Sequence, residues 1–255
     1  MTPELLPVTY APAQVLLSFL IAAVGSFTAL TAAAAARRPD GRVNRLNIFF
    51  AGLALGGVGI WSMHFVGMIA WKVQLGVGYR WIETMVSLVA AVIVSALALG
   101  HVAANPKDWK RLLVAGPLAG LGVAVMHYLG MYSMRFGGFF DWNVGIVVLS
   151  VVIAIVAATA ALWLAFNTRQ RWQRAVAALV MATAVCTMHY TGMAAASVMC
   201  TTPNRYAVPA GLLRPADLPL MVILIAVGVA CVIAVDLVMQ RLTANGPIGA
   251  AGRSR

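Results

Sequence analysis

The sequence predicts an all-α integral membrane protein with seven transmembrane helices, arranged as three two-helix repeats followed by a seventh helix. Three observations predict this fold. The 255 residues are 62% apolar and 10% charged, whereas soluble proteins carry about 25% charged residues. The apolar residues form runs of about 20, long enough to cross a hydrocarbon core about 30 Å thick. A histidine-containing hexapeptide also recurs three times at nearly equal spacing, which indicates an internal repeat.

Proline, glycine and charged residues separate the apolar runs and set the expected spans. These spans are Gln14–Ala36, Ile48–Ala70, Thr84–Ala103, Leu112–Ser133, Val144–Phe166, Ala175–Ala196 and Leu218–Met239. The connections are too short for a separate soluble domain, so residues 1–240 are expected to form one membrane domain. Residues 241–255 contain Asn245-Gly246-Pro247 and further glycines, and this composition predicts a short disordered cytoplasmic tail.

The Lys and Arg residues are distributed unequally between the two sets of connections. Of the 18 basic residues, 13 lie after the first, third and fifth spans or in the tail, and five lie in the other connections. Because basic loops stay in the cytoplasm, the N-terminus is predicted outside and the C-terminus inside. The net charge of +11 is explained by this topology. The lipid bilayer is therefore the expected partner, and nucleic acid is not.

The repeated segment has the pattern Met-His-x-x-Gly-Met. Its copies are Met63-His64-Phe65-Val66-Gly67-Met68, Met126-His127-Tyr128-Leu129-Gly130-Met131 and Met188-His189-Tyr190-Thr191-Gly192-Met193. The histidines are 63 and then 62 residues apart, and they are three of the four in the chain. Each copy lies toward the outer end of an outward-running span. The three histidines are therefore expected at matching depth near the outer face, where they converge if their helices are neighbours.

Small residues precede each histidine by seven and by five positions. They are Gly57, Gly120 and Ala182, and Gly59, Gly122 and Ala184. Small residues let transmembrane helices approach closely, so these positions predict helix packing.

Each histidine and the methionine four residues later share one helix face. Ionisable residues at membrane depth usually mark a functional site, and imidazole with thioether in the absence of carboxylate favours copper, especially Cu(I), over zinc, calcium or magnesium. Haem is the alternative cofactor, although three equivalent histidines fit a three-fold metal site better than two axial positions. The candidate metal ligands are His64, His127, His189, Met63, Met68, Met126, Met131, Met188 and Met193.

Two further residues lie outside this ligand set. Cys186 shares a helix face with His189, three residues later, which makes it either an additional ligand or an apolar packing residue. His101 lies at the cytoplasmic end of the third span without the motif, and we interpret it as an interface residue. Phosphate loops, paired carboxylates and nucleophile–base pairs are absent from the sequence, so nothing supports nucleotide or hydrolytic chemistry.

The chain resembles the MHYT family of bacterial integral membrane sensor domains, named for the string that Met188-His189-Tyr190-Thr191 reproduces. The resemblance implies an inner-membrane protein that binds copper through the motif His and Met and through tyrosines, here Tyr128 and Tyr190, and that senses a diatomic gas (O2, CO or NO) or redox state. Family members are often fused to cyclic di-GMP enzymes, histidine kinases or DNA-binding modules. This chain is expected to be a stand-alone member without an output domain, so its signal would pass to a separate cytoplasmic partner.

Three functions remain open at this point. The first is a metal-binding sensor module, which we favour. The second is a copper-dependent membrane oxidoreductase, which needs an open coordination position and a substrate pocket. The third is copper transport or storage, which needs ligands at successive depths. The repeated motifs lie at one depth, so transport ranks last, and an enzyme is less favoured than a sensor.

Overall fold

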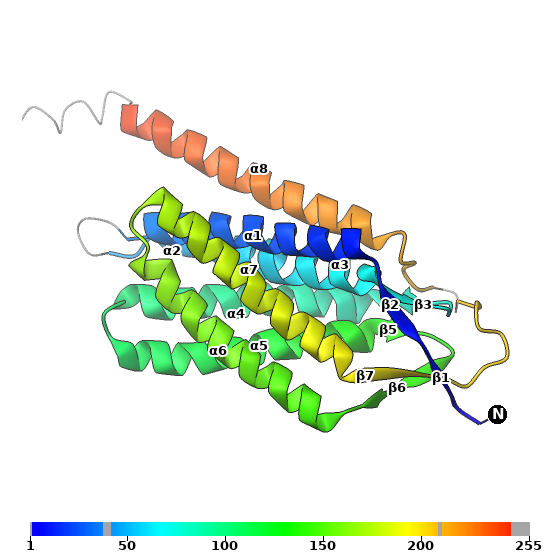
Figure 1. The fold of residues 1–255 in the computed structure, drawn as a ribbon. Coiled ribbons are helices and arrows are strands. Elements are labelled where there is room, and N and C mark those ends of the chain that lie inside the picture. The colour runs from blue at the N-terminus through cyan, green and yellow to red at the C-terminus, as the bar shows by residue number, and fades with distance from the viewer. Residues whose placement is uncertain (1, 38–41, 209–210, 246–255) are drawn as a thin grey trace, which may run out of the picture.

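The computed structural model describes residues 2–37, 42–208 and 211–245, and most of them are helical (Figure 1). Six helical segments are long and apolar enough to cross a membrane. They are α1 (Pro12–Ala35), a continuous segment made of α2 (Arg45–Gly52), η1 (Leu53–Ser62) and α3 (Met63–Ala70), α4 (Trp81–Ala104), α5 (Trp109–Ser133), α6 (Val144–Asn167) and α7 (Arg171–Ala194). The first six predicted spans are therefore confirmed as apolar helices.

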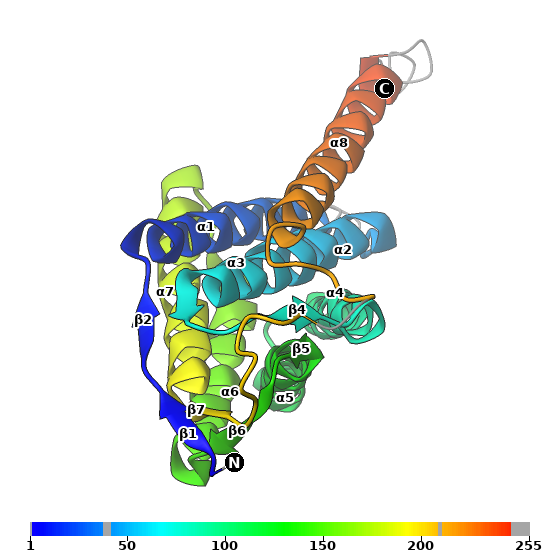
Figure 2. The same ribbon diagram turned by 90° about the vertical axis from the view of Figure 1, so that its right-hand side faces the viewer.

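The seventh predicted span corresponds to α8 (Leu218–Asn245). The helix continues past the predicted end at Met239, and the five residues assigned to the start of a disordered tail are helical. Residues 246–255 lie outside the described residues. Figure 2 shows α8 extending away from the other helices. It contacts η1 and α3, and whether it spans the membrane stays a prediction.

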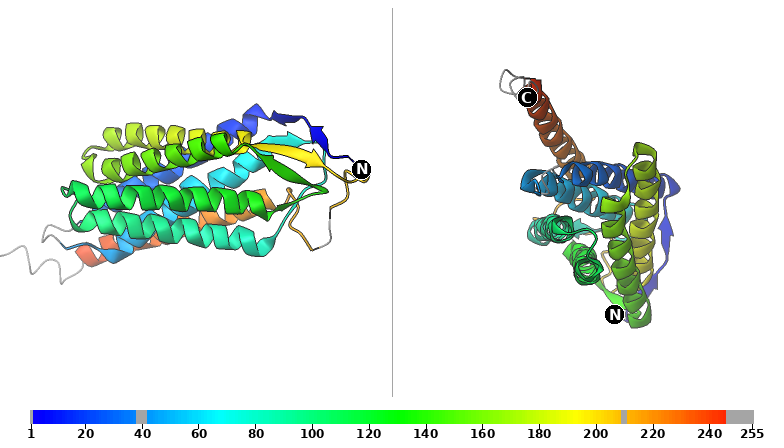
Figure 3. Two further views of the ribbon diagram at one scale, coloured as in Figure 1. Left: turned by 90° about the horizontal axis from the view of Figure 1, so that it is seen from below. Right: turned by 90° about the vertical axis from the view of Figure 1, so that its left-hand side faces the viewer.

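The six spans form a closed ring of neighbours (Figure 3). The segment containing η1 packs between α1 and α4, α5 packs between α4 and α6, and α7 packs between α6 and α1. We call η1–α3, α5 and α7 the motif helices, because each carries one copy of the histidine motif, and α1, α4 and α6 the flanking helices. The two kinds alternate around the ring, so the three motifs can face a common axis.

Polar caps begin several of these helices. The side chain of Asn44 accepts hydrogen bonds from Leu46 N and Asn47 N at the start of α2, and Asp108 accepts one from Lys110 N at the start of α5. Asn143 caps α6 in the same way, and Gln170 forms a capping box with Gln173 at α7. These side chains satisfy backbone N–H groups that have no partner within the helix, which fixes where each span starts.

Most of the predicted small positions bring helices together. A Cβ on Gly59 would lie at 3.4 Å from backbone atoms of α1, one on Gly120 would clash with the backbone of α6 at Ile155, and one on Gly122 would meet Val94 of α4. Gly57 is different, because a Cβ there would make only ordinary contacts at 3.7 Å or more. Close packing by small residues therefore holds for three of these four glycines.

The prediction of an all-α chain is wrong at one end of the bundle, where short strands gather (Figure 1). We call it the strand end, and the opposite end the loop end. The strands are β1 (Glu4–Leu6), β2 (Val8–Tyr10), β3 (Trp71–Val73), β4 (Gly78–Tyr79), β5 (Met134–Arg135), β6 (Gly138–Trp142) and β7 (Ala196–Cys200). Their antiparallel pairs are β1–β7, β6–β7, β2–β3 and β4–β5. Strands this short leave too little alternation to be detected in sequence.

The strand pairs also close into a ring. β4–β5 joins the first connection at this end to the second, and β6–β7 joins the second to the third. The N-terminal segment completes the circle, because β1 pairs with the third connection and β2 with the first. An ion pair between Glu4 and Arg205 fastens the same junction. The strand end is thus a cap over the bundle axis.

Candidate metal centre

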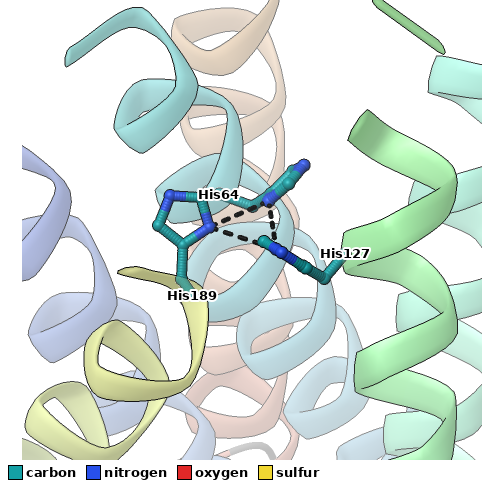
Figure 4. A group of neighbouring side chains, drawn as sticks. All are labelled: His64, His127 and His189. Carbon is teal, nitrogen blue, oxygen red and sulfur yellow. Dashed lines mark hydrogen bonds between the residues drawn. The ribbon is translucent and has the colours of Figure 1, made fainter. Parts of the chain in front are cut away.

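The three motif histidines meet on the bundle axis (Figure 4). Nδ1 of His64 lies 3.0 Å from Nδ1 of His189 and 3.1 Å from Nδ1 of His127, and the third pair is 3.3 Å apart. All three side chains are buried, at 1% exposure. Among the described residues, the group that could hold a metal ion is this one. The predicted convergence of the histidines is therefore observed.

The three histidines also lie at matching depth, as predicted. His64 and His127 each stand six residues before the end of their helix, and His189 stands five before the end of α7. At 1.5 Å per residue, this places the centre about 8–9 Å below the strand end of the helices.

The motif glycines pack against the Nε2 side of the imidazoles, opposite the Nδ1 atoms that face the axis. A Cβ on Gly130 would clash with Nε2 of His64, one on Gly192 with Nε2 of His127, and one on Gly67 with Nε2 of His189. Each histidine therefore packs against the glycine of the next motif helix, and the three contacts run in one direction around the axis. The motif glycine therefore makes room for the imidazole of a neighbouring motif helix.

The arrangement of nitrogens fits a metal ion. A triangle with sides of 3.0–3.3 Å has its corners about 1.8 Å from its centre. Three imidazoles bound at about 2.0–2.1 Å in a tetrahedral site lie about 3.3–3.4 Å apart, so the three Nδ1 atoms have nearly the spacing of nitrogens that would hold one metal ion. The buried Nε2 atoms have no hydrogen-bond partner. If each Nε2 carries the proton, the three Nδ1 lone pairs converge on the axis, and a cation placed there compensates their repulsion.

The six motif methionines are all buried, at 2% exposure or less. Those that precede a histidine face neighbouring helices: Met63 packs with Ala22 of α1 and Ala182 of α7, and Met188 packs with Ala154 of α6. Of the methionines four residues after a histidine, Met68 lines a pocket of about 160 Å³ at the strand end. The methionines surround the centre, and their role as ligands stays a prediction.

The motif tyrosines bond to flanking helices. The hydroxyl of Tyr128 hydrogen-bonds Ser150 of α6 at 2.5 Å, and that of Tyr190 hydrogen-bonds Ser18 of α1 at 2.8 Å. Their hydroxyls therefore already have protein partners, and a ligand role for either tyrosine stays a prediction.

In the first repeat, Phe65 has no hydroxyl, and a different side chain reaches the flanking helix. Trp61 Nε1 donates to Ser87 Oγ of α4 at 3.0 Å. The three serine partners, Ser18, Ser87 and Ser150, were not identified from the sequence. One signal could have found two of them, since Ser87 and Ser150 are 63 residues apart, the spacing of the repeat itself.

Two other predicted residues lie apart from the three-nitrogen group. Cys186 is buried beside Met63 and Ala22, and the group of metal-ligating atoms contains the histidines without it. His101 lies in the last turn of α4 at the loop end, where Arg111 donates to its backbone carbonyl.

The cap reaches the centre through aromatic side chains. Tyr79 of β4 is buried, and its ring centroid lies 6.1 Å from that of Phe65. Burial raises the pKa of the Tyr79 phenol, so the side chain stays neutral at physiological pH. Tyr10 of β2 packs edge-on against Tyr190 at 5.7 Å. The strands therefore cover the site with apolar and neutral groups.

A family model described as a bacterial signalling protein N-terminal repeat, MHYT, matches residues 57–115, 120–178 and 183–248. The chain belongs to the MHYT family. Each match contains one copy of the histidine motif. Together with the six apolar helices, the matches support a multi-pass membrane protein.

Curated relatives of this MHYT chain are signalling proteins. It is 40% identical over 193 residues, 74% of its length, to the bifunctional diguanylate cyclase/cyclic di-GMP phosphodiesterase MucR of Pseudomonas aeruginosa, covering 28% of that protein. It is 35% identical over 216 residues, 81% of its length, to the cyclic di-GMP phosphodiesterase NbdA of the same organism, covering 27%. The signaling protein YkoW of Bacillus subtilis is 30% identical over 197 residues, 74% of this chain and 24% of YkoW. The chain thus spans about a quarter of these relatives, and no solved structure matches it.

Proposed function

We propose that this chain is the membrane sensor domain of a bacterial signalling system, and that its three-histidine centre binds a metal ion, with copper as the favoured metal. The convergence of three buried Nδ1 atoms carries the proposal. Imidazole ligands suit copper and zinc, while the buried thioethers nearby favour copper, Cu(I) in particular. A bound copper ion would supply redox activity and an open coordination position, and His64, His127 and His189 would hold it.

The location of the site supports sensing at the outer face of the inner membrane. The connections rich in Lys and Arg lie at the loop end (Figure 1), which the positive-inside rule assigns to the cytoplasm. The strand end and its nearby centre then face outward. A change in the ligands or redox state of the ion would alter how the motif helices pack against each other, and a diatomic gas is the proposed stimulus.

The receiving enzyme is proposed from the relatives. MucR and NbdA are named for the turnover of cyclic di-GMP, so this domain is proposed to regulate a cyclic di-GMP enzyme in the cytoplasm, carried by the same chain or by a partner. The described metal-ligating group lies at one depth, which supports sensing over transport across the membrane.

The test is metal analysis of the purified protein together with its optical spectrum. We expect about one copper per chain, and loss of most of it when His64, His127 or His189 is replaced by Ala, because a two-imidazole site binds metal more weakly. His101→Ala is the matched control, since this fourth histidine lies apart from the centre, and it should keep its copper.

Two results would change the proposal. Full copper retention in all three single variants would contradict a shared site. A Soret band in the optical spectrum would replace copper by haem.

A further inference from the structure

An apolar cavity of about 50 Å³ lies inside the helix bundle. Three of its lining residues have the same place in the repeat: Ile60, Val123 and Val185 each precede a motif histidine by four residues. Four residues are about one helical turn, on the same face. The cavity therefore lies on the bundle axis, one turn from the histidine centre toward the loop end.

The lining of the cavity selects a neutral apolar occupant. Alanine, leucine, isoleucine, valine and methionine make up most of it, and Ser95 supplies the one hydroxyl among the lining residues. A buried water needs two to four polar partners, and apolar cavities that lack them stay dry and take up species such as xenon or benzene. An ion would lose its hydration without compensation. The volume admits a molecule of about two or three heavy atoms.

One wall of the cavity also faces the lipid side. A groove of about 540 Å³ runs between α4 and α5, and it shares Ala98 and Ala119 with the cavity. Its rim is formed by side chains that are largely exposed, including Leu97 at 69% and Leu118 at 63%. In a membrane these side chains contact hydrocarbon, so the side chains of Ala98 and Ala119 form a wall common to the cavity and to a groove on the lipid side.

We infer that this cavity is a binding site for a small neutral apolar molecule, of the size of a diatomic gas, that enters from the hydrocarbon phase between α4 and α5. The occupant would lie beside Met188, which lines the cavity and precedes His189. The inference deepens the proposed function, since it supplies a route to the centre from the membrane interior. Binding in the cavity itself does not depend on a metal.

Xenon is the probe, applied under pressure to metal-free protein in lipid nanodiscs. The measurement is the NMR shift of the methyl groups of Ile60, Val123 and Val185. We expect saturable shifts in all three, and the Ala158→Leu substitution should weaken xenon binding by about fivefold or more, because the larger side chain fills the cavity that Ala158 lines. Ala160→Leu is the matched control on the exposed side of α6, and it should bind xenon as the parent does.

A second variant keeps the test valid if Ala158→Leu fails to fold. Val123→Ala enlarges the cavity and should strengthen xenon binding. Methyl shifts that do not saturate, or that are the same in Ala158→Leu and the parent, would overturn the inference. Because the protein is metal-free, this failure is separate from a failure to bind copper: either result leaves the other open.

Discussion

The first motif helix differs from the other two in three ways, although all three bring a histidine to the same centre. In its most apolar 18-residue stretch, 83% of the residues are buried, against 39% in α5 and 50% in α7. It contains the π-helical segment η1, which ends directly before Met63. It also carries phenylalanine where the other two copies have tyrosine.

The three repeats share the contacts at the centre and differ in the contact with the flanking helix. The Nδ1 distances and the glycine contacts are alike in all three repeats. The contact with the flanking serine changes from a tyrosine hydroxyl in two repeats to the Trp61 indole in the first. The comparison teaches that histidine and glycine build the centre, while the residue after the histidine docks the motif helix onto its neighbour and can be replaced.

The largest effect is expected from adding a methyl group at a motif glycine. Gly67→Ala should lower the free energy of unfolding by about 1–3 kcal/mol, because the new Cβ overpacks against the imidazole of His189. It should also lower copper occupancy, since that imidazole must move. Thermal unfolding with metal analysis measures both effects.

Gly57→Ala provides the control in the same span, where an added Cβ meets only ordinary contacts, and it should keep its copper. Gly130→Ala and Gly192→Ala should behave like Gly67→Ala. If the first repeat alone were sensitive, the idea of three equivalent glycine contacts would be wrong.

A narrower effect is expected at Trp61, because a change there should lower stability and leave the copper site intact. Trp61→Phe removes the N–H that donates to Ser87 and to the Thr84 carbonyl, and it leaves part of a buried site unfilled. The free energy of unfolding should fall by about 1–3 kcal/mol. Copper occupancy should stay near the parent value, because Trp61 docks the helix and does not touch the centre's nitrogens. A parallel loss of copper would contradict this separation between helix docking and metal binding.

The smallest effect is expected at the tyrosines. Tyr128→Phe and Tyr190→Phe each remove one interhelical hydrogen bond, which is worth about 0.6–1.5 kcal/mol. If the hydroxyls only dock helices, copper content and the optical spectrum stay unchanged, as Phe65 in the first repeat suggests. A spectral shift in either variant would instead make that tyrosine a ligand.

Much of the helical framework could be predicted from hydrophobic runs, and the starts of α6 and α8 were placed correctly, but other helix starts were placed too late. The structure begins α4 at Trp81, α5 at Trp109 and α7 at Arg171, three or four residues before the predicted starts. Aromatic and basic residues favour the membrane interface, so the helices extend beyond the apolar stretch that reveals them. The short strands of the cap depend on long-range pairing, which no local pattern reports.

The centre was only partly predictable for the same reason. The spacing of His64, His127 and His189 indicated a common depth, but which ring nitrogen faces the axis depends on how the helices turn against one another. The role of the motif glycines was hidden too, because each one packs against a histidine from a different repeat. Sequence spacing within one motif cannot show a contact between motifs.

The one-way circle of histidine–glycine contacts makes the centre a shared property of the whole ring. Each motif helix offers an imidazole to one neighbour and receives an imidazole from the other. A shift of α7, for example, disturbs both His127, which packs against Gly192, and His189, which packs against Gly67. No helix can therefore leave its position alone, and the three are expected to switch together, as an all-or-none unit rather than by graded steps.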